Sequence, residues 1–398
     1  MNTRKKDYLL KDINVHIIFS ITLLAIMGVA SLTPAFPEII RQFDISVQEI
    51  GLLITVFTLP GILLAPLMGI LADRLGRKAI LLPSILLFGL SGFLCAFAKD
   101  YEQLLILRFL QGTGAAPLGM INITLVGDIY KGRQRATVMG YNASILSIGT
   151  AVYPAVGGAL AVIAWYYPFY LPLIALPVGL FVIFGLKNPE PSKKQEFLTY
   201  LKNTWKTINK KDVWALFVLS ILVFIILYGA FLTFFPLLLE DKFGANAFNI
   251  GMVMSIMSII TALVSSQLGM LSRRFTPKSL LIYSAGFYLL AMLIMAYADS
   301  WTLIILAIII FGLGHGLFIP NIQNLLVGFA SINERAGFMS INSMVLRIGQ
   351  TLGPVSVALF YNLGGLRSSF LTGATVALVM IIISSFLTTE INQSDISL

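Results

Sequence analysis

The sequence predicts an all-α membrane protein in which twelve transmembrane helices form two pseudo-symmetric six-helix bundles. Hydrophobic residues make up 58% of the chain and charged residues 11%, whereas soluble domains carry about 25% charged residues. Apolar runs of roughly 20 residues, the length that crosses a bilayer, recur along the chain. The residue pattern of the first half also returns 200 positions later, so that Gly69 aligns with Gly269.

The apolar runs predict where each span lies. We expect spans near residues 14–37, 48–71, 79–98, 103–127, 137–162, 165–186, 213–239, 248–271, 279–298, 302–328, 337–362 and 368–388. Proline inside a span, as at Pro154 and Pro354, is compatible with a helix because neighbouring helices satisfy the freed carbonyl groups. A polar, lysine-rich stretch separates the sixth span from the seventh. We therefore expect an N-terminal bundle at 1–186, a linker at 187–212 and a C-terminal bundle at 213–398.

The lysine and arginine residues are distributed unevenly between the two sets of loops. Those on the side of the N-terminus carry 21 of them and those on the other side carry 4. Positively charged loops remain in the cytoplasm, so we expect a multi-pass protein of the cell membrane with both termini and the linker in the cytoplasm. This distribution also explains the net charge of +9 without a nucleic-acid partner.

The internal repeat runs in register across several spans. The matching residues of the first half are Phe43, Ile50, Gly51, Gly69, Leu71, Arg74, Lys78, Leu81, Gly112, Gly114, Asn142, Gly149 and Pro154, each with an identical residue 200 positions later. Two parallel bundles related by an axis along the membrane normal place a binding site between them, near the midplane.

Several classes of protein lack support in the sequence. One cysteine, Cys95, excludes a disulfide framework and a cysteine metal site. Two histidines form no metal motif, and the phosphate loop of an ATP-driven pump is missing. A receptor would need a signalling domain that neither the short termini nor the linker can house. We therefore expect no enzyme activity, cofactor or bound metal.

Three motifs stand out, the segments at 69–81 and 104–116 and a set of glycines with one proline in the fifth span, which includes Gly149 and Pro154. Together they resemble the major facilitator superfamily over essentially the whole chain. The segment GILADRLGRKAIL at 69–81 is similar to the family's loop between the second and third helices, and LLILRFLQGTGAA at 104–116 to its fourth-helix motif. The glycines and proline of the fifth span resemble the pattern of the family's antiporters, drug exporters above all, although Tyr153 stands where that pattern has glycine. The residues of this antiporter-like helix are Gly140, Gly149, Pro154, Gly157 and Gly158.

The resemblance implies a latch that joins the two bundles on the cytoplasmic side in the outward-open state. Asp73 is expected to face the N-terminus of the eleventh helix, near Ala336, where the helix dipole favours an anion. Arg77 is expected to pair with Asp128. Positive charge retained for topology alone is the alternative for two of the latch residues, Arg74 and Lys78. The full latch set is Gly69, Asp73, Arg74, Gly76, Arg77, Lys78 and Asp128.

Ionisable side chains inside spans are costly and usually functional. The resemblance implies that Arg108 faces the cavity and takes part in proton handling; the alternative is snorkelling to the outer interface. No Asp or Glu lies in the middle of a span. The proton carrier is therefore expected to be His315, whose flanking glycines leave room around the ring, or else Glu38. A packing role for His315 remains the alternative.

Polar residues at a suitable depth are candidates for the substrate cavity. Arg347 either binds an anionic group of the substrate or pairs with an acid elsewhere. The remaining candidates are Asn122, Tyr141, Asn142, Tyr153, Asn321, Asn324, Asn342 and Gln350. Abundant aromatic residues and 14 methionines suit an adaptable apolar cavity.

The sequence thus predicts a secondary transporter that works by alternating access, acting as a monomer in the bilayer on a small-molecule substrate. The antiporter-like fifth helix favours export of amphipathic or hydrophobic compounds, as in drug efflux, in exchange for protons. A tightly packed, bent fifth helix would seal the cavity against ion leak; an ordinary kinked packing helix is the alternative. A sugar or metabolite exporter, or a uniporter, of the same fold remains open, and an uptake symporter is less favoured.

Overall fold

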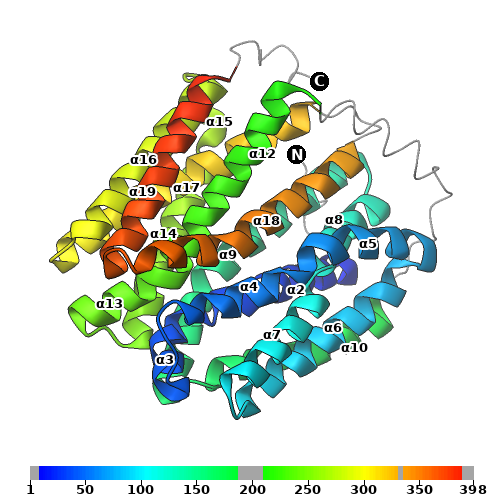
Figure 1. The fold of residues 1–398 in the computed structure, drawn as a ribbon. Coiled ribbons are helices and arrows are strands. Elements are labelled where there is room, and N and C mark those ends of the chain that lie inside the picture. The colour runs from blue at the N-terminus through cyan, green and yellow to red at the C-terminus, as the bar shows by residue number, and fades with distance from the viewer. Residues whose placement is uncertain (1–8, 187–208, 330–334, 388–398) are drawn as a thin grey trace.

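The computed structural model describes residues 9–186, 209–329 and 335–387. Within these residues, twelve helical stretches are long and apolar enough to cross a membrane. They form two groups of antiparallel helices, coloured blue to teal and green to red in Figure 1. Most of the predicted 187–212 linker lies outside the described residues.

The first group contains six spans, several of them built from more than one helical segment. They are α2 (Ile13–Ala30) with η1 (Thr33–Ala35) and α3 (Phe36–Phe43); η2 (Glu49–Gly51), α4 (Leu52–Thr58) and α5 (Pro60–Leu75); α6 (Arg77–Leu94) with η3 (Cys95–Phe97); α7 (Tyr101–Ala115) with α8 (Leu118–Ile129); α9 (Gly132–Ile163); and η4 (Tyr167–Ile174) with α10 (Ala175–Gly185).

The second group repeats this order. Its spans are α12 (Lys211–Phe224), η5 (Ile225–Phe234) and α13 (Phe235–Phe243); α14 (Ala247–Ser266), followed by the short α15 (Leu268–Leu271); α16 (Pro277–Tyr297); α17 (Trp301–Phe329); α18 (Arg335–Tyr361); and α19 (Gly365–Ser385).

The predicted spans agree with these helices, with differences at their ends and inside two of them. The first span continues to Phe43 rather than ending near residue 37. The second is interrupted at Leu59, where α4 ends and Pro60 begins α5, because proline offers no N–H to the preceding turn. In the seventh span, η5 is π-helical, which an evenly apolar sequence does not reveal.

The alternating helices give the molecule two ends, for which we use fixed names. The linker face carries the start of α2, the turn between α5 and α6, the start of α9, the end of α10 and the start of α12. The far face carries the ends of α3 and α13, the start of α14, and the turn between α18 and α19; α3 and α13 lie together there in Figure 1.

Turn residues explain how the helices end at these two faces. Asp44 and Gly244 are equivalent in the repeat, and both end a helix in the left-handed conformation, with φ of 49° and 61°. Gly76, with φ of 93°, forms the turn between α5 and α6, a conformation that favours glycine. The equivalent residue Thr276 has φ of −69° and caps α16 through its hydroxyl group. The two charged turns therefore differ in backbone geometry.

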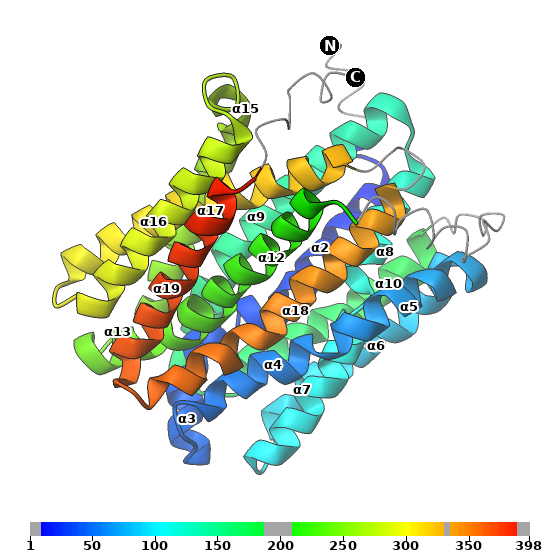
Figure 2. The ribbon, with the colours of Figure 1, turned by 45° about the horizontal axis from the view of Figure 1, so that its top comes forward.

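Two contacts that are equivalent in the repeat join the halves, because the glycine of each half meets the proline of the other. A methyl group added at Gly51 would lie 2.8 Å from Pro354 Cβ, and one added at Gly251 would lie 2.1 Å from the carbonyl oxygen of Pro154. The first contact joins η2, directly before α4, to α18, and the second joins α14 to α9. The helices α4 and α18 lie side by side in Figure 2. Glycine at these positions allows close helix contact, so the repeated sequence builds a pseudo-symmetric interface.

Hydrogen bonds extend this interface from the far face toward the middle of the bundle. At the far face, Gln48 Nε2 donates to Asn362 Oδ1 at 2.6 Å. Deeper in the bundle, Thr55 Oγ1 donates to the Thr351 carbonyl oxygen at 3.1 Å, and the Thr58 and Thr351 hydroxyl groups are 2.9 Å apart. These contacts close the two halves against each other on the far side.

Candidate functional site

The charged turn at the linker face is held by one buried arginine. Arg77 is 8% exposed; its Nε donates to Asp128 Oδ2 at 2.9 Å, and its Nη1 pairs with Asp73. The predicted pair of Arg77 and Asp128 is therefore present, and it links the start of α6 to the end of α8. Lys78 donates to the Ile183 carbonyl oxygen of α10, whereas Arg74 is exposed.

The latch contact between the two halves stays a prediction. Residues 330–334, next to the start of α18, lie outside the described residues. In this structure Asp73 pairs with Arg77 within its own half. Gly69 contributes a close contact of another kind, because a methyl group there would lie 2.2 Å from Met120 Cε of α8.

Arg108 is buried among three helices instead of snorkelling to an interface. It is 1% exposed. Its Nη1 donates to the Gly28 carbonyl oxygen at 2.9 Å and to Gln111 Oε1 at 2.6 Å, and its Nε donates to the Leu53 carbonyl oxygen at 3.2 Å. The guanidinium lies 4.3 Å from the centroid of the Phe57 ring, and Nη2 is buried without a partner. Arg108 thus joins α7 to α2 and α4 in this structure, and its part in proton handling stays a prediction.

A polar cluster joins α2, α8 and α9 in the first half. Thr22 Oγ1 donates to Asn142 Oδ1 at 2.5 Å and accepts from Asn122 Nδ2 at 2.5 Å. The carbonyl oxygen of the Asn122 side chain is buried without a partner. Two predicted cavity residues, Asn122 and Asn142, are therefore brought together, by a threonine that the sequence analysis did not identify. Tyr141 and Tyr153 are half-buried on the same helix as Asn142.

The second half holds a related amide pair. Asn342 Nδ2 donates to Gln323 Oε1 at 3.0 Å, and the Asn342 side-chain oxygen is buried without a partner. Gln323 was also missed, although the equivalence of Asn142 and Asn342 was a signal that each has a partner on the preceding helix. Asn321 donates to the Pro277 carbonyl oxygen at 2.9 Å and so fixes α17 to the start of α16. Asn324 is exposed.

Arg347 lies on α18 where this helix meets both its own half and the first half. Its Nη1 donates to Gln350 Oε1 at 3.2 Å, and Tyr228 of η5 is close enough to interact with it electrostatically. A methyl group added at Gly61 of α5 would lie 3.0 Å from Arg347 Cδ and Nε. The arginine therefore packs against the other half of the molecule, at the end of the interface formed by Thr58 and Thr351.

His315 is held against two aromatic side chains between α16 and α17. Its Nδ1 is 2.6 Å from the Tyr288 hydroxyl oxygen, and its ring stacks on Phe311 with the centroids 6.2 Å apart. The flanking glycines were expected to leave room around the ring, and in the structure both lie against neighbouring helices. A methyl group at Gly314 would lie 3.0 Å from the Ser284 carbonyl oxygen, and one at Gly316 would lie 2.7 Å from that of Thr261. These glycines serve the packing of α17 on its neighbours.

The small residues of α9 make close contacts near the far face. A methyl group at Gly157 would lie 1.8 Å from the Ser31 carbonyl oxygen, and one at Gly158 would lie 2.2 Å from that of Ala247 in the other half. Gly149 packs on the side chains of Leu23 and Ile26 of α2, whereas Gly140 has nothing within 4 Å. The antiporter-like pattern therefore marks the part of α9 that contacts both its own half and the opposite one.

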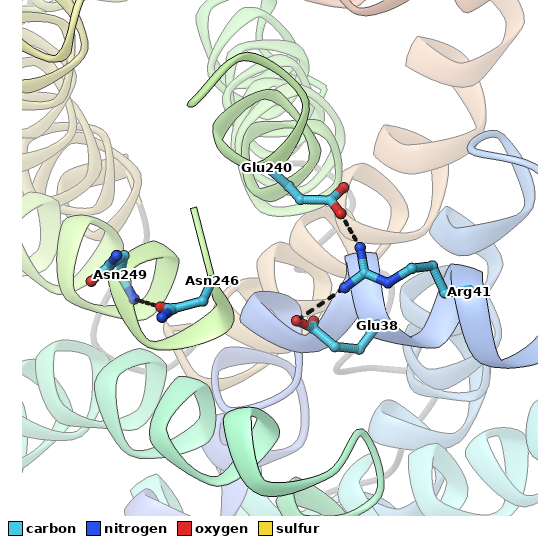
Figure 3. A network of polar contacts seen from close by, with 5 residues as sticks. All are labelled: Glu38, Arg41, Glu240, Asn246 and Asn249. Atoms are coloured by element: carbon cyan, nitrogen blue, oxygen red, sulfur yellow. Dashed lines mark hydrogen bonds and ion pairs between the residues drawn. The ribbon is translucent and has the colours of Figure 1, made fainter. Parts of the chain in front are cut away.

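An ion-pair network at the far face connects the two halves. Figure 3 shows Arg41 of α3 between Glu38 of the same helix and Glu240 of α13. Arg41 pairs with Glu240, and its Nη2 lies 3.4 Å from Glu38 Oε1. Glu38 Oε2 is buried without a partner. The cross-half pair was missed; the signal was a pair of opposite charges near the ends of the equivalent helices α3 and α13.

Comparison with known proteins places these features in a family. The Major Facilitator Superfamily model matches residues 18–298 and 219–396. Multidrug resistance protein 1 of Bacillus subtilis (strain 168) is 26% identical over 355 residues, which cover 89% of this chain and 91% of that protein. Quinolone resistance protein NorA of Staphylococcus aureus (strain COL) is 25% identical over 358 residues, covering 87% and 89%.

Solved structures share the fold at lower identity. A bacterial homologue of the human lysosomal transporter Spinster, in an inward-facing and occupied conformation, superimposes with a TM-score of 0.78 at 18% identity and covers 99% of both chains. The nucleoside transporter NupG gives a TM-score of 0.77 at 15% identity and covers 94% of this chain and 98% of its own. Because the family model spans both halves of this twelve-helix chain, the protein is a member of the Major Facilitator Superfamily.

Proposed function

We propose that this multi-pass membrane protein is a secondary transporter that exports small amphipathic or hydrophobic compounds in exchange for protons. The interface between the two halves supports this proposal. Two contacts that the internal repeat relates, Gly51 with Pro354 and Gly251 with Pro154, join halves built on the same sequence pattern. Such halves can rock about a central site. Family membership points to a transporter rather than an enzyme, and the names of the relatives from Bacillus subtilis and Staphylococcus aureus support drug efflux.

We assign the linker face to the cytoplasm because it carries most of the positive charge. The contacts at the far face then correspond to a state that is closed to the outside. In this proposal the bundles 1–186 and 213–398 move as units joined by the linker at 187–212, and the latch around Asp73 engages when the cytoplasmic side closes.

Proton coupling is assigned to a short set of residues. His315 carries an imidazole, a group able to bind and release a proton, and the described hydrogen bond occupies its Nδ1, so proton exchange would use Nε2. Glu38 is the second candidate, because one of its carboxylate oxygens is buried without a partner. Arg108 is assigned a supporting role, since its bonds to carbonyl oxygens fix the helices of the first half.

Transport in proteoliposomes tests the proposal. Purified protein is reconstituted with an imposed pH gradient, and uptake of a cationic dye (ethidium), an amphipathic antibiotic and a sugar is followed. We expect accumulation of the dye or the antibiotic that disappears when an ionophore collapses the gradient. Protein-free liposomes are the control. Accumulation that ignores the gradient would reject proton antiport.

A sugar or metabolite exporter is the second candidate, and one observation favours it. The side-chain oxygens of Asn122 and Asn342 are buried acceptors without partners, and a hydroxylated substrate could donate hydrogen bonds to both. Counterflow of a labelled sugar in the same proteoliposomes, with no transport of the dye or the antibiotic, would favour this candidate over drug efflux.

A further inference from the structure

Arg347 is the charged residue that lies deepest in a span among those the structure describes. It is near the middle of α18, whereas the carboxylates of the described spans lie close to the ends of their helices. The ion pairs formed by the described residues do not include Arg347. A charge held inside a membrane protein without a countercharge is costly and is a sign of function.

The other intramembrane arginine shows that the cost can be met without a ligand. Arg108 directs its donors to two carbonyl oxygens and Gln111 and covers the Phe57 ring. Arg347 has one described hydrogen bond, to Gln350, and is only partly buried. A guanidinium has five N–H donors in a fork that matches a carboxylate, so most of this capacity is available to a ligand.

The surroundings of Arg347 depart from the internal repeat. The positions equivalent to Arg347, Gln350 and Tyr228 are Ser147, Thr150 and Gly28. Residues shared by the halves serve the common scaffold, as Gly51 and Pro354 do, whereas these three occur in one half only. Gly61, whose equivalent is Thr261, leaves space for the arginine side chain on the facing helix.

An aromatic surface adjoins the charge. Phe224 and Tyr228 stack with ring centroids 5.7 Å apart. Tyr228 belongs to η5, a π-helical segment, and such segments are rare and frequent at functional sites. A ligand with an aromatic body and an acidic group would place the body on these rings and the acid on Arg347.

We propose that Arg347 binds the anionic group of the substrate, so that the protein prefers amphipathic organic anions bearing a carboxylate or sulfonate. This inference rests on the proposed transport function and narrows its substrate class. The hydrogen bond to Gln350 positions the guanidinium, and the contact with Gly61 places the bound anion where the two halves meet.

Equilibrium binding tests the charge preference without any substitution. The protein is placed in nanodiscs made only of phosphatidylcholine, which removes competition by anionic lipid headgroups, and binds labelled 1-pyrenebutyrate, its neutral methyl ester and a pyrene trimethylammonium cation. We expect the wild type to bind the acid about tenfold or more tightly than the ester. Equal affinity for the three compounds overturns the proposal. Anionic lipid that displaces the acid shows that a headgroup occupies the same site.

Substitutions then assign the preference to Arg347. Arg347→Gln should weaken binding of the acid by about 10- to 100-fold and leave the ester within about twofold, and Arg347→Lys should fall between. Gly61→Ala keeps the charge but displaces it, and should weaken the acid selectively. Arg133→Gln, at an exposed arginine of α9, is the matched control. Unchanged selectivity in Arg347→Gln overturns the assignment.

The experiments distinguish a failure of the anion preference from a failure of the proposed transport function. If ethidium is driven by the pH gradient but the acid is not preferred, the transporter assignment holds and the anion preference falls. If no compound is transported and the acid still binds through Arg347, the anion site holds and the transport proposal falls.

Discussion

At the residue scale, two arginines show that one side chain can meet the cost of burial in different ways. Arg108 spreads its charge over the carbonyl oxygens of Gly28 and Leu53 and the side chain of Gln111. Arg347 has a single described bond, to Gln350, beside an aromatic pair. The first arrangement fixes helices to one another, and the second leaves donors available to a ligand.

We expect Arg108→Lys to destabilise the protein, because an ammonium group cannot reach three acceptors on separate helices as the guanidinium does. The loss of charged hydrogen bonds should lower the free energy of unfolding by about 2 kcal/mol. Thermal unfolding in detergent measures this, with Arg133→Gln as the exposed control. A lysine variant as stable and as active as the wild type would contradict the structural role.

The second prediction at this scale separates proton carriage by His315 from packing. His315→Ala should abolish transport driven by the pH gradient, whereas Tyr288→Phe removes only the hydrogen bond at 2.6 Å and should retain coupling. Both variants are assayed in proteoliposomes and checked for folding by size-exclusion chromatography. If His315→Ala remains coupled, Glu38→Gln becomes the next variant to test. If both variants lose transport equally, the hydrogen bond matters rather than the proton.

Some contacts of the candidate site can be predicted from the sequence and others cannot, depending on how many partners each side chain could reach. The pair of Arg77 and Asp128 could be predicted because opposite charges at helix ends on one face have few alternatives. Thr22 and Gln323 could not, because a polar side chain inside a span finds its partner through the rotation of two helices. The glycines beside His315 were interpreted locally, and their contacts with Ser284 and Thr261 involve distant segments.

At the element scale, α9 illustrates how glycine pattern becomes interface. Gly157 approaches Ser31 of its own half and Gly158 approaches Ala247 of the other, so one turn of helix contacts both bundles. The spans themselves were predicted from the lengths of apolar runs. The π-helical η5 was not, because a segment that is apolar on all sides carries no periodic signal of its hydrogen-bond pattern.

Gly158→Ala should open the far face. Its methyl group would lie 2.2 Å from the Ala247 carbonyl oxygen, and such overpacking costs about 1–3 kcal/mol in the state that is closed there. Crosslinking of cysteines placed at Gln48 and Asn362, in a Cys95→Ser background, measures the closed fraction and should fall. Gly140→Ala, on the same helix with nothing within 4 Å, is the matched control. Equal crosslinking in both variants would contradict the contact.

At the scale of the whole molecule, the repeat builds a pseudo-symmetric interface between the halves, whereas the charged residues at the linker face and at the far face do not follow the repeat. Of the two copies of the charged turn at the linker face, the first alone has an acid, because Asp73 aligns with Arg273, and the first alone has a glycine with positive φ, Gly76, where the second has Thr276. At the far face, Arg41 of one half pairs with Glu240 of the other. Two faces with different ion pairs can favour two different states of the same bundle.

This arrangement predicts that substitutions at the two faces shift the populations of the far-open and far-closed states in opposite directions. Arg41→Gln removes a pair that joins the halves in the far-closed state and should favour the open far face, whereas Asp73→Asn removes the proposed latch and should favour the closed one. Exposed ion pairs contribute about 0.2–1 kcal/mol, so each population ratio should change by about fivefold or less. Arg273→Gln should have little effect, since it is not part of the latch.

Distances between spin labels at Lys99 and Leu363, two exposed positions at the far face of opposite halves, measure these populations by double electron–electron resonance. Arg41→Gln should increase the population with the longer distance between the labels, and Asp73→Asn should increase the population with the shorter distance. Shifts in the same direction would show that the two ion pairs act on a common state, and an equal effect of Asp73→Asn and Arg273→Gln would show that the latch is shared by both halves. Opposite shifts with Arg273→Gln unchanged would make the acid at position 73, and not the repeated turn itself, the determinant of closure at the linker face.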